Sequence, residues 1–315
     1  MAVNPSIQLG TSGNWAIKED NLLAYKQLGN KFFDREFDFS RGTRATFVGR
    51  NGLIQESGLT SAELVTNGNF SQEGSELVTN GDFSNGGTGW LKSGEADRSL
   101  GKIISTSGSL SSLTQVILTL GKRYKLQFEI TDNTNGSIKV GSQNGGLDID
   151  ASVNSLGIHT YIFTSLGTYI SFAREGGITD ITINNVSVKE VGQDWDFVSG
   201  ATVGDDKAII SGDGSVAGLI EQTSVFSSGK TYKITLDAVI NSGGGLNVKH
   251  GIAYADNIGS MITTGSYTFY YTASSTKSLV IARKTGGIAY DSSVTNISVI
   301  EIQTDVPRID FTDDT

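Results

Sequence analysis

The chain has 315 residues, among them 40 glycines, 2 prolines and no cysteine, and its formal charge at pH 7 is −9. The absence of cysteine excludes disulfides and thiolate metal sites. The acidic balance, with no run of lysine or arginine, disfavours nucleic acid as a partner. Glycine, serine, threonine and asparagine alternate with β-branched and aromatic residues, so the composition predicts an all-β protein of two or three domains.

The N-terminal region, residues 1–60, is predicted to contain a short helix around Lys18–Gln27 and a hairpin. Asn51–Gly52 is a strong signal for a type I′ turn between the runs TFVGR and LIQES. The opening MAVNPSIQLG has neither the basic nor the apolar segment of a secretory signal. No apolar stretch approaches the roughly 18 residues of a membrane span, so we expect no membrane insertion.

The pentapeptide LVTNG occurs twice, at Leu64–Gly68 and at Leu77–Gly81. Only the second copy continues to a tryptophan, Trp90, in the run NGDFSNGGTGW. We therefore predict that the second copy opens a domain and that the first copy belongs to a linker at residues 61–74. The alternative interpretation is that Leu64–Ser71 pairs as an additional edge strand.

From residue 75 onward the chain repeats itself. GKRYKLQFEI, which begins at Gly121, returns as GKTYKITLDAVI at Gly229, 108 residues later (229 − 121). VSVKEV at residues 186–191 returns as ISVIEI at 297–302, and Trp90 is matched by Trp195. Equivalent anchors in the same order indicate a duplication. The domain prediction is module A at 75–192, module B at 193–303 and a C-terminal tail at 304–315.

Each module is predicted to be an antiparallel β-sandwich of the jelly-roll type. YKLQFEI and SYTFYYT alternate with a period of two, which gives one buried and one wet face. In SYTFYYT this places Tyr270 on the face opposite Tyr267, Phe269 and Tyr271. Asn184–Asn185 is expected to form a bulge in the last strand of module A. Trp90 and Trp195 are interpreted as core aromatics rather than sugar-stacking platforms.

LVTNGDFSNGGTGW, GKRYKLQFEI and ITINNVSVKEV together resemble carbohydrate-binding-module-like jelly rolls. Two further segments, FDFSRGTRATFVGRNGLI near the start and VPRIDF near the end, resemble a class of bacteriophage virion proteins of the head-fibre or tail-fibre type. That resemblance implies an N-terminal region that docks onto the particle, with jelly-roll modules projecting from it. The residues assigned to docking on this basis are Trp15, Phe37, Phe39, Arg41 and Arg44.

The sequence contains no catalytic constellation, so we expect no enzyme. Its two histidines, His159 and His250, lie in different modules at non-equivalent positions, and both are interpreted as structural. No cofactor is predicted. The jelly-roll resemblance implies at most a structural Ca²⁺, for which Asp82 is the candidate ligand.

Three functions remain open from the sequence. The first is a non-enzymatic virion structural protein that binds capsid, portal or tail proteins; the resemblance implies a homo-oligomer, a trimer in fibre-type proteins. The second is a host-adsorption protein that binds surface glycans through Tyr254, Tyr270 and Tyr290. The third is a set of accessory modules for a polysaccharide depolymerase. The phage resemblance also implies assembly in the host cytoplasm, release by lysis and location on the virion.

Overall fold

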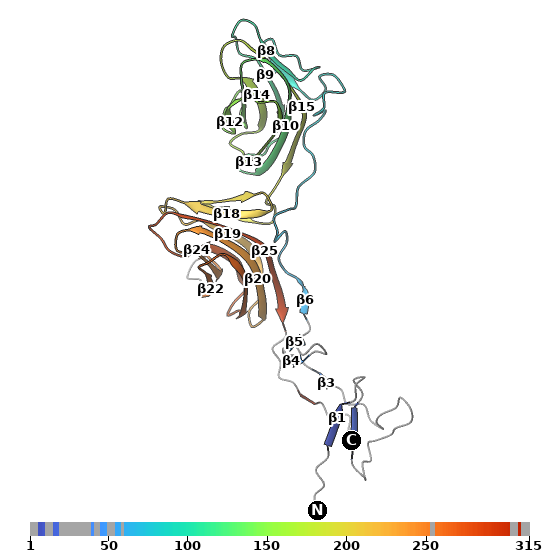
Figure 1. Ribbon diagram of the computed structural model, residues 1–315, viewed down its shortest axis with the longest axis vertical. Helices are drawn as coiled ribbons and strands as arrows, with labels where there is room; N and C mark the ends of the chain where they lie inside the picture. The colour runs from blue at the N-terminus through green and yellow to red at the C-terminus, as the bar shows by residue number, and fades with distance from the viewer. Residues whose placement is uncertain are drawn as a thin grey trace, which may run out of the picture. The chain divides into compact units, whose positions relative to one another are not determined.

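Every element in the part of the chain that the structure describes is a β-strand, which confirms the all-β prediction. The structure is a computed structural model and describes residues 6–9, 15–18, 39–40, 45–48, 54–57, 60–252, 256–302 and 308–309 (Figure 1). The chain divides into two units, one formed by Met1–Ser61 with Ile302–Thr315 and the other by Ala62–Glu301.

No helix that could cross a membrane is found in the described residues.

Three antiparallel strand pairs are found among the described residues of the first unit. β1 (Ser6–Leu9) pairs with β2 (Trp15–Lys18), and β4 (Ala45–Val48) pairs with β5 (Ile54–Ser57). The second of these pairs confirms the predicted hairpin. The third pair joins the two ends of the chain, because β3 (Phe39–Ser40) lies beside β26 (Arg308–Ile309).

Several predictions for the N-terminal region fall outside the described residues. The helix expected at Lys18–Gln27 begins at a residue that belongs to β2, and residues 19–27 are not among those described. Of the proposed docking residues, Trp15 lies in β2 and Phe39 in β3, while Phe37, Arg41 and Arg44 lie outside the described residues.

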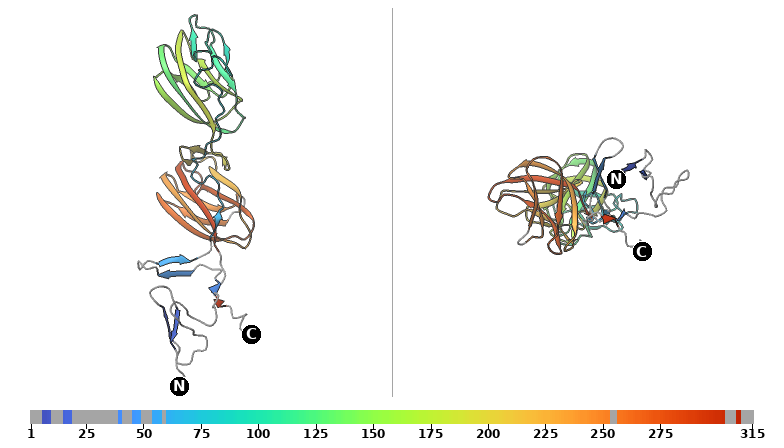
Figure 2. Two further views of the ribbon diagram at one scale, coloured as in Figure 1. Left: turned by 90° about the vertical axis from the view of Figure 1, so that its right-hand side faces the viewer. Right: turned by 90° about the horizontal axis from the view of Figure 1, so that it is seen from below.

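The second unit contains two β-sandwiches, each seen as two layers of strands (Figure 2). The first sandwich has sheets in the order β13-β10-β15-β8 and β12-β11-β14-β9-β7. Its strands are β7 (Leu91–Ser93), β8 (Lys102–Ser105), β9 (Ser112–Val116), β10 (Arg123–Asn135), β11 (Ile138–Gly141), β12 (Asp150–Val153), β13 (Gly157–Thr164), β14 (Tyr169–Arg174) and β15 (Thr179–Glu190).

The second sandwich repeats this arrangement, with sheets in the order β16-β19-β24-β21-β22 and β17-β18-β25-β20-β23; β6 (Thr60–Glu63) also pairs with β25. Its strands are β16 (Asp196–Val198), β17 (Ala201–Gly204), β18 (Lys207–Gly212), β19 (Leu219–Phe226), β20 (Thr231–Ser242), β21 (Leu246–His250), β22 (Asp256–Met261), β23 (Gly265–Thr272), β24 (Lys277–Arg283) and β25 (Tyr290–Ile302).

Side-chain alternation builds the two cores as predicted. In β10 every second residue from Tyr124 to Ile130 is buried, and β20 repeats the pattern. The predicted bulge in β15 is present, since the β10–β15 register shifts between Gln127 and Glu129 and Asn185 has a φ of 51°. Trp90 is 1 % exposed and stacks on Phe83, which confirms its interpretation as a core residue.

The second LVTNG copy closes the first sandwich. Its Leu77 amide donates to the Val188 carbonyl of β15 at 3.0 Å. The Trp90 indole donates to the Asn80 carbonyl at 3.0 Å. The buried Gln115 amide both accepts from the Thr79 N–H and donates to its carbonyl, as a neighbouring strand would.

The first LVTNG copy makes the same contacts in the second sandwich. Leu64 N–H donates to the Val299 carbonyl at 3.0 Å. Trp195 donates to the Thr66 carbonyl at 3.1 Å, and Gln222 accepts from the Thr66 N–H and donates to its carbonyl.

The structure thus differs from the linker prediction. Residues 64–71 are the opening segment of the second sandwich, and the first sandwich lies in sequence between this segment and Trp195. The physical reason is that the two copies carry the same hydrogen-bonding groups and meet equivalent partners, Trp90 with Gln115 in one sandwich and Trp195 with Gln222 in the other.

Candidate functional site

The outer face formed by β20 and β23 in the second sandwich is the strongest candidate for a binding surface. Alternation turns Ile234 and Leu236 of β20 toward the core. The residues that alternate with these two face outward. They pair across to β23 as Lys233 with Tyr270, Thr235 with Thr268 and Asp237 with Ser266. The face is therefore rich in hydroxyl and charged groups.

Tyr270 is the aromatic residue that distinguishes this face. It is 45 % exposed, and every other Trp, Tyr or Phe in the range 61–252 and 256–302 is buried or half-buried. Its exposure follows from the alternation of β23, where Tyr267, Phe269 and Tyr271 take the inward positions. The sequence prediction that Tyr270 points away from these three is confirmed.

Hydrogen bonds hold the polar groups of this face in place. Asp237 accepts from the Ser266 hydroxyl with Oδ1 and from the Asn296 amide at 2.7 Å with Oδ2. Both hydrogen bonds lower the pKa of Asp237, and the bond from Asn296 has the larger effect. Thr231 and Thr272 bond each other across the strands at 2.8 Å. An exposed aromatic ring beside oriented donors and acceptors can bind a ligand that has both an apolar face and hydroxyl groups.

The other two candidate tyrosines are placed differently. Tyr254 lies outside the described residues. Tyr290 is 3 % exposed, and its hydroxyl accepts from Gly218 N–H at 3.1 Å and donates to the Val216 carbonyl. A ring enclosed in this way cannot stack on a ligand, so the assignment of Tyr290 to glycan binding is wrong for this structure.

The equivalent face of the first sandwich, formed by β10 and β13, makes contacts that the β20–β23 face does not make. Lys125 and Ile162 are cross-strand partners in β10 and β13, as Lys233 and Tyr270 are in β20 and β23. Ile162 packs against the core cluster of the second sandwich, and the Arg123 guanidinium lies 4.3 Å from the centroid of the Phe197 ring. The end of this face that carries Arg123 and Ile162 therefore lies against the second sandwich.

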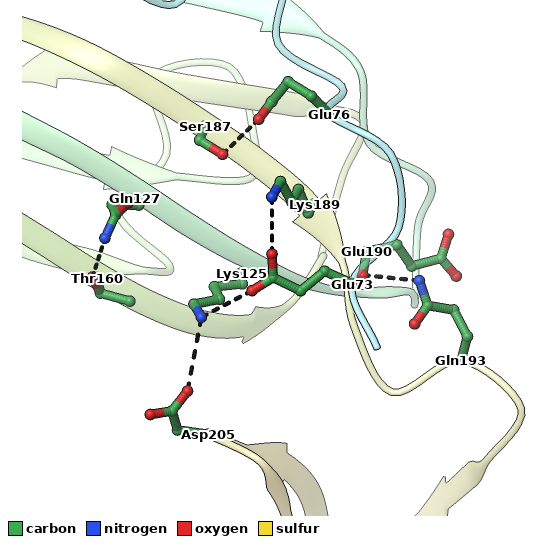
Figure 3. A network of polar contacts seen from close by, with 10 residues as sticks. All are labelled: Glu73, Glu76, Lys125, Gln127, Thr160, Ser187, Lys189, Glu190, Gln193 and Asp205. Atoms are coloured by element: carbon green, nitrogen blue, oxygen red, sulfur yellow. Dashed lines mark hydrogen bonds and ion pairs between the residues drawn. The ribbon is translucent and has the colours of Figure 1, made fainter. Parts of the chain in front are cut away.

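A group of charged side chains, Glu73, Lys125, Lys189 and Asp205, lies together nearby in space (Figure 3). One oxygen of Glu73 lies 2.9 Å from Lys125 Nζ and the other lies 2.9 Å from Lys189 Nζ. Lys125 Nζ also lies 3.7 Å from Asp205 of the second sandwich. The hydrogen bonds from Lys189 and Lys125 hold the pKa of Glu73 below its usual value, so Glu73 is ionised at neutral pH.

The two histidines have structural contacts. His159 Nε2 lies 2.8 Å from the Ser155 carbonyl, and its ring stacks on Phe128. His250 is fully buried, with Nε2 2.8 Å from the Ser275 carbonyl and Nδ1 3.0 Å from the Tyr271 hydroxyl. Neither has a nucleophile and an orienting group arranged as in a catalytic triad.

Asp82 is engaged within its own turn. Its Oδ1 accepts from both the backbone N–H and the hydroxyl of Ser84, and these bonds lower its pKa. Asn69 holds Ser71 in the same way in the first LVTNG copy. Within the described ranges, no group of three or more His, Cys, Asp or Glu side chains could hold a metal ion. The Ca²⁺ assignment of Asp82 stays a prediction.

Comparison with known proteins gives a likeness of architecture. No family model matches the chain, and no curated protein sequence matches it. Among solved structures it is similar to the N-terminal CBM22-1–CBM22-2 tandem domain of Paenibacillus barcinonensis Xyn10C, at 10 % identity and a TM-score of 0.25, over 72 % of this chain and 98 % of that one. It is also similar to allantoicase from Saccharomyces cerevisiae, at 12 % identity and a TM-score of 0.28, over 62 % of this chain and 79 % of that one.

Proposed function

We propose that this chain is a non-catalytic carbohydrate-binding protein and that the β20–β23 face of its second sandwich is the binding surface. The observation that carries the proposal is Tyr270, an exposed aromatic side chain on a face whose other paired outward residues are hydroxyl-bearing or charged, with Val239 as an exposed apolar residue farther along β20.

The chemistry of the face suits a sugar. A pyranose ring presents C–H groups on one side, which can pack on the Tyr270 ring, and hydroxyl groups around its rim. Lys233 is the cross-strand partner of Tyr270, Thr268 lies two residues before it in β23, and the Asp237 carboxylate lies on the same face, so donor and acceptor groups accompany the ring. One aromatic contact on an open sheet supports weak, reversible binding rather than tight capture of a small molecule.

Removal of the Tyr270 ring is the direct test of the proposed site. The Tyr270→Ala variant should lose retardation in gels that contain a soluble polysaccharide, with binding weakened about five- to tenfold because a stacked aromatic contributes roughly 1–1.4 kcal/mol. Tyr270→Phe keeps the ring and should retain most of the binding. Ile158→Ala, at a position 69 % exposed on the first sandwich, should bind as the unchanged protein does. Equal binding by Tyr270→Ala and the unchanged protein would contradict the assignment of this face.

A second function, that of a virion structural protein, is supported by a different observation. The two segments whose sequences resemble phage virion proteins lie together, since Arg308 pairs with Ser40 and Ile309 with Phe39. In this proposal the unit formed by both chain ends docks onto capsid, portal or tail, and the chain acts as a homo-oligomer. Both functions can hold in one protein, because a virion appendage can also capture host glycans.

Antibody–gold labelling of purified phage particles tests the second function. Label on the head would assign the chain to a capsid fibre or decoration, and label on the tail would assign it to the adsorption apparatus. Absence of label from all particles would contradict the virion proposal and leave glycan binding untouched.

A further inference from the structure

The chain passes between the two sandwiches twice, and the two passages bond to each other. Residues 72–74 enter the first sandwich and residues 190–193 leave it; together they are called the connector. Gly74 N–H donates to the Glu190 carbonyl at 2.8 Å, and Glu73 forms an antiparallel bridge with Val191. The Gln193 amide donates to the Glu190 carbonyl at 2.9 Å (Figure 3). A bonded double passage restricts bending more than a single flexible linker does.

Apolar and cation–π contacts add a second restraint beside the connector. Arg123 donates to the Phe197 carbonyl at 3.2 Å while its guanidinium covers the Phe197 ring. Burial lowers the pKa of Arg123, and the nearby charge of Asp196 opposes this effect. Ile162 packs against the second core, and Val191 belongs to that core. These contacts fix where the two sandwiches meet.

Ion pairs lie beside the place where the two sandwiches meet. Glu73 extends from the connector and bridges Lys125 of β10 and Lys189 of β15, and Lys125 also faces Asp205 of the second sandwich. Asp206 contributes a further negative charge near Lys125. Glu190 of the connector forms an ion pair with Lys122. Negative charges from the connector and from the second sandwich therefore converge on lysines of the first.

The second sandwich keeps a lysine, Lys233, at the position of Lys125 but differs from the first sandwich at three neighbouring positions. By the β10–β13 and β20–β23 registers and the matching closing strands, Arg123 corresponds to Thr231, Ile162 to Tyr270 and Lys189 to Ile300. The ion pair that both sandwiches share is Lys122–Glu190 in one and Lys230–Glu301 in the other. Of the three residues that differ, Arg123 and Ile162 contact the second sandwich and Lys189 contacts Glu73 of the connector, so all three lie at the joint between the sandwiches.

We propose that Glu73, Lys125, Lys189 and Asp205 form an ionic latch that holds the two sandwiches in one orientation and releases it as salt concentration rises. The latch is independent of the proposed glycan binding. Glu73, Lys125 and Lys189 are about one-third exposed and Asp205 is 83 % exposed, so their attraction is screened by dissolved ions. The apolar contacts remain when the latch is open, and the sandwiches then rotate about them.

Fluorescence transfer between two labels tests the latch, and the chain has no cysteine of its own to interfere. Leu156→Cys in the first sandwich and Ile262→Cys in the second provide labelling positions that are 66 % and 60 % exposed. At 50 mM salt the full-length protein should give a narrow distance distribution. Glu73→Gln should increase the open population about two- to fivefold, the effect expected for a partly exposed ion pair. At 1 M salt, where the screening length is about 3 Å, the unchanged protein should resemble the variant.

Asp180→Asn is the matched control, because it removes one carboxylate from an ion pair, Lys102–Asp180 at 2.7 Å, that lies wholly within the first sandwich. It should leave the distance distribution narrow. Lys189→Gln should reproduce the effect of Glu73→Gln, and the circular dichroism of both must match that of the unchanged protein. Equal distributions for Glu73→Gln and the unchanged protein at 50 mM salt, or an equal broadening by Asp180→Asn, would overturn the latch.

Discussion

A few buried polar side chains hold the opening segments in both sandwiches. Gln222 is 7 % exposed. Its side-chain amide accepts from the Thr66 N–H and donates to the Thr66 carbonyl, as the backbone of a neighbouring strand would. The same amide also donates to the Asp194 carbonyl, next to Trp195. Each such hydrogen bond contributes about 0.5–1.5 kcal/mol, so a non-polar residue at either glutamine position should weaken the attachment of its opening segment.

The glycines of the two LVTNG copies bring backbone close to backbone. A Cβ at Gly68 would lie 1.9 Å from the Ile297 carbonyl oxygen, and one at Gly81 would lie 2.0 Å from that of Val186. Both carbonyls belong to the closing strands, which cannot move without breaking their sheets. Glycine is required here because the segment must touch the strand.

Gly68→Ala is therefore expected to destabilise the second sandwich by about 1–3 kcal/mol, the range for forced overpacking. Gly265→Ala in β23 is the control, since a Cβ there meets no atom within 4 Å, and its effect should stay under about 1 kcal/mol. Urea unfolding followed by tryptophan fluorescence and circular dichroism measures both. A stability equal to that of the control would show that the opening segment is not held against β25.

At the scale of elements, alternation predicted the long strands, and the structure confirms them. YKLQFEI and SYTFYYT each carry a strict period of two, so the direction of Tyr270 follows from the sequence alone. Tyr290 could not be assigned in the same way. Its ring lies against Gly200, Gly212 and Gly218, which come from three separate segments that only the folded chain brings together.

The position of the first opening segment was missed because it has no alternation and forms backbone bonds to a strand more than 200 residues away. Leu64 bonds Val299, and Gly68 bonds Ile297. A signal was present in the sequence nonetheless. Module B begins with QDWDFVSG and lacks the opening that module A has, while an unused opening, NGNF, stands upstream of module A. Because module B lacks an opening segment and an additional copy of that segment stands upstream of module A, the sequence indicates that module A is inserted into module B.

On the scale of the whole molecule, the chain is a series of nested insertions. The first sandwich is inserted between the opening segment of the second sandwich and Trp195, and the second unit lies in sequence between β3 and β26 of the first unit. Each inner part can be completed before the outer part that encloses it in sequence. The second sandwich, in contrast, depends on residues synthesised before the first.

This order predicts an asymmetric response to truncation, which two fragments can reveal. Residues 62–302 contain both sandwiches apart from the first two residues of β6, whereas residues 73–302 lack the opening segment and with it Val65 and Phe70, which are 7 % and 2 % exposed in the second core. The loss of two buried apolar side chains costs roughly 3–6 kcal/mol, comparable with the whole stability of a small domain. Calorimetry should therefore show two unfolding transitions for the longer fragment and only that of the first sandwich for the shorter one. Trp195 emission should shift to longer wavelength in the shorter fragment because the Phe70 ring, 5.3 Å from it, is gone. Two intact transitions in the shorter fragment would mean that residues 62–72 decorate the second sandwich without completing it.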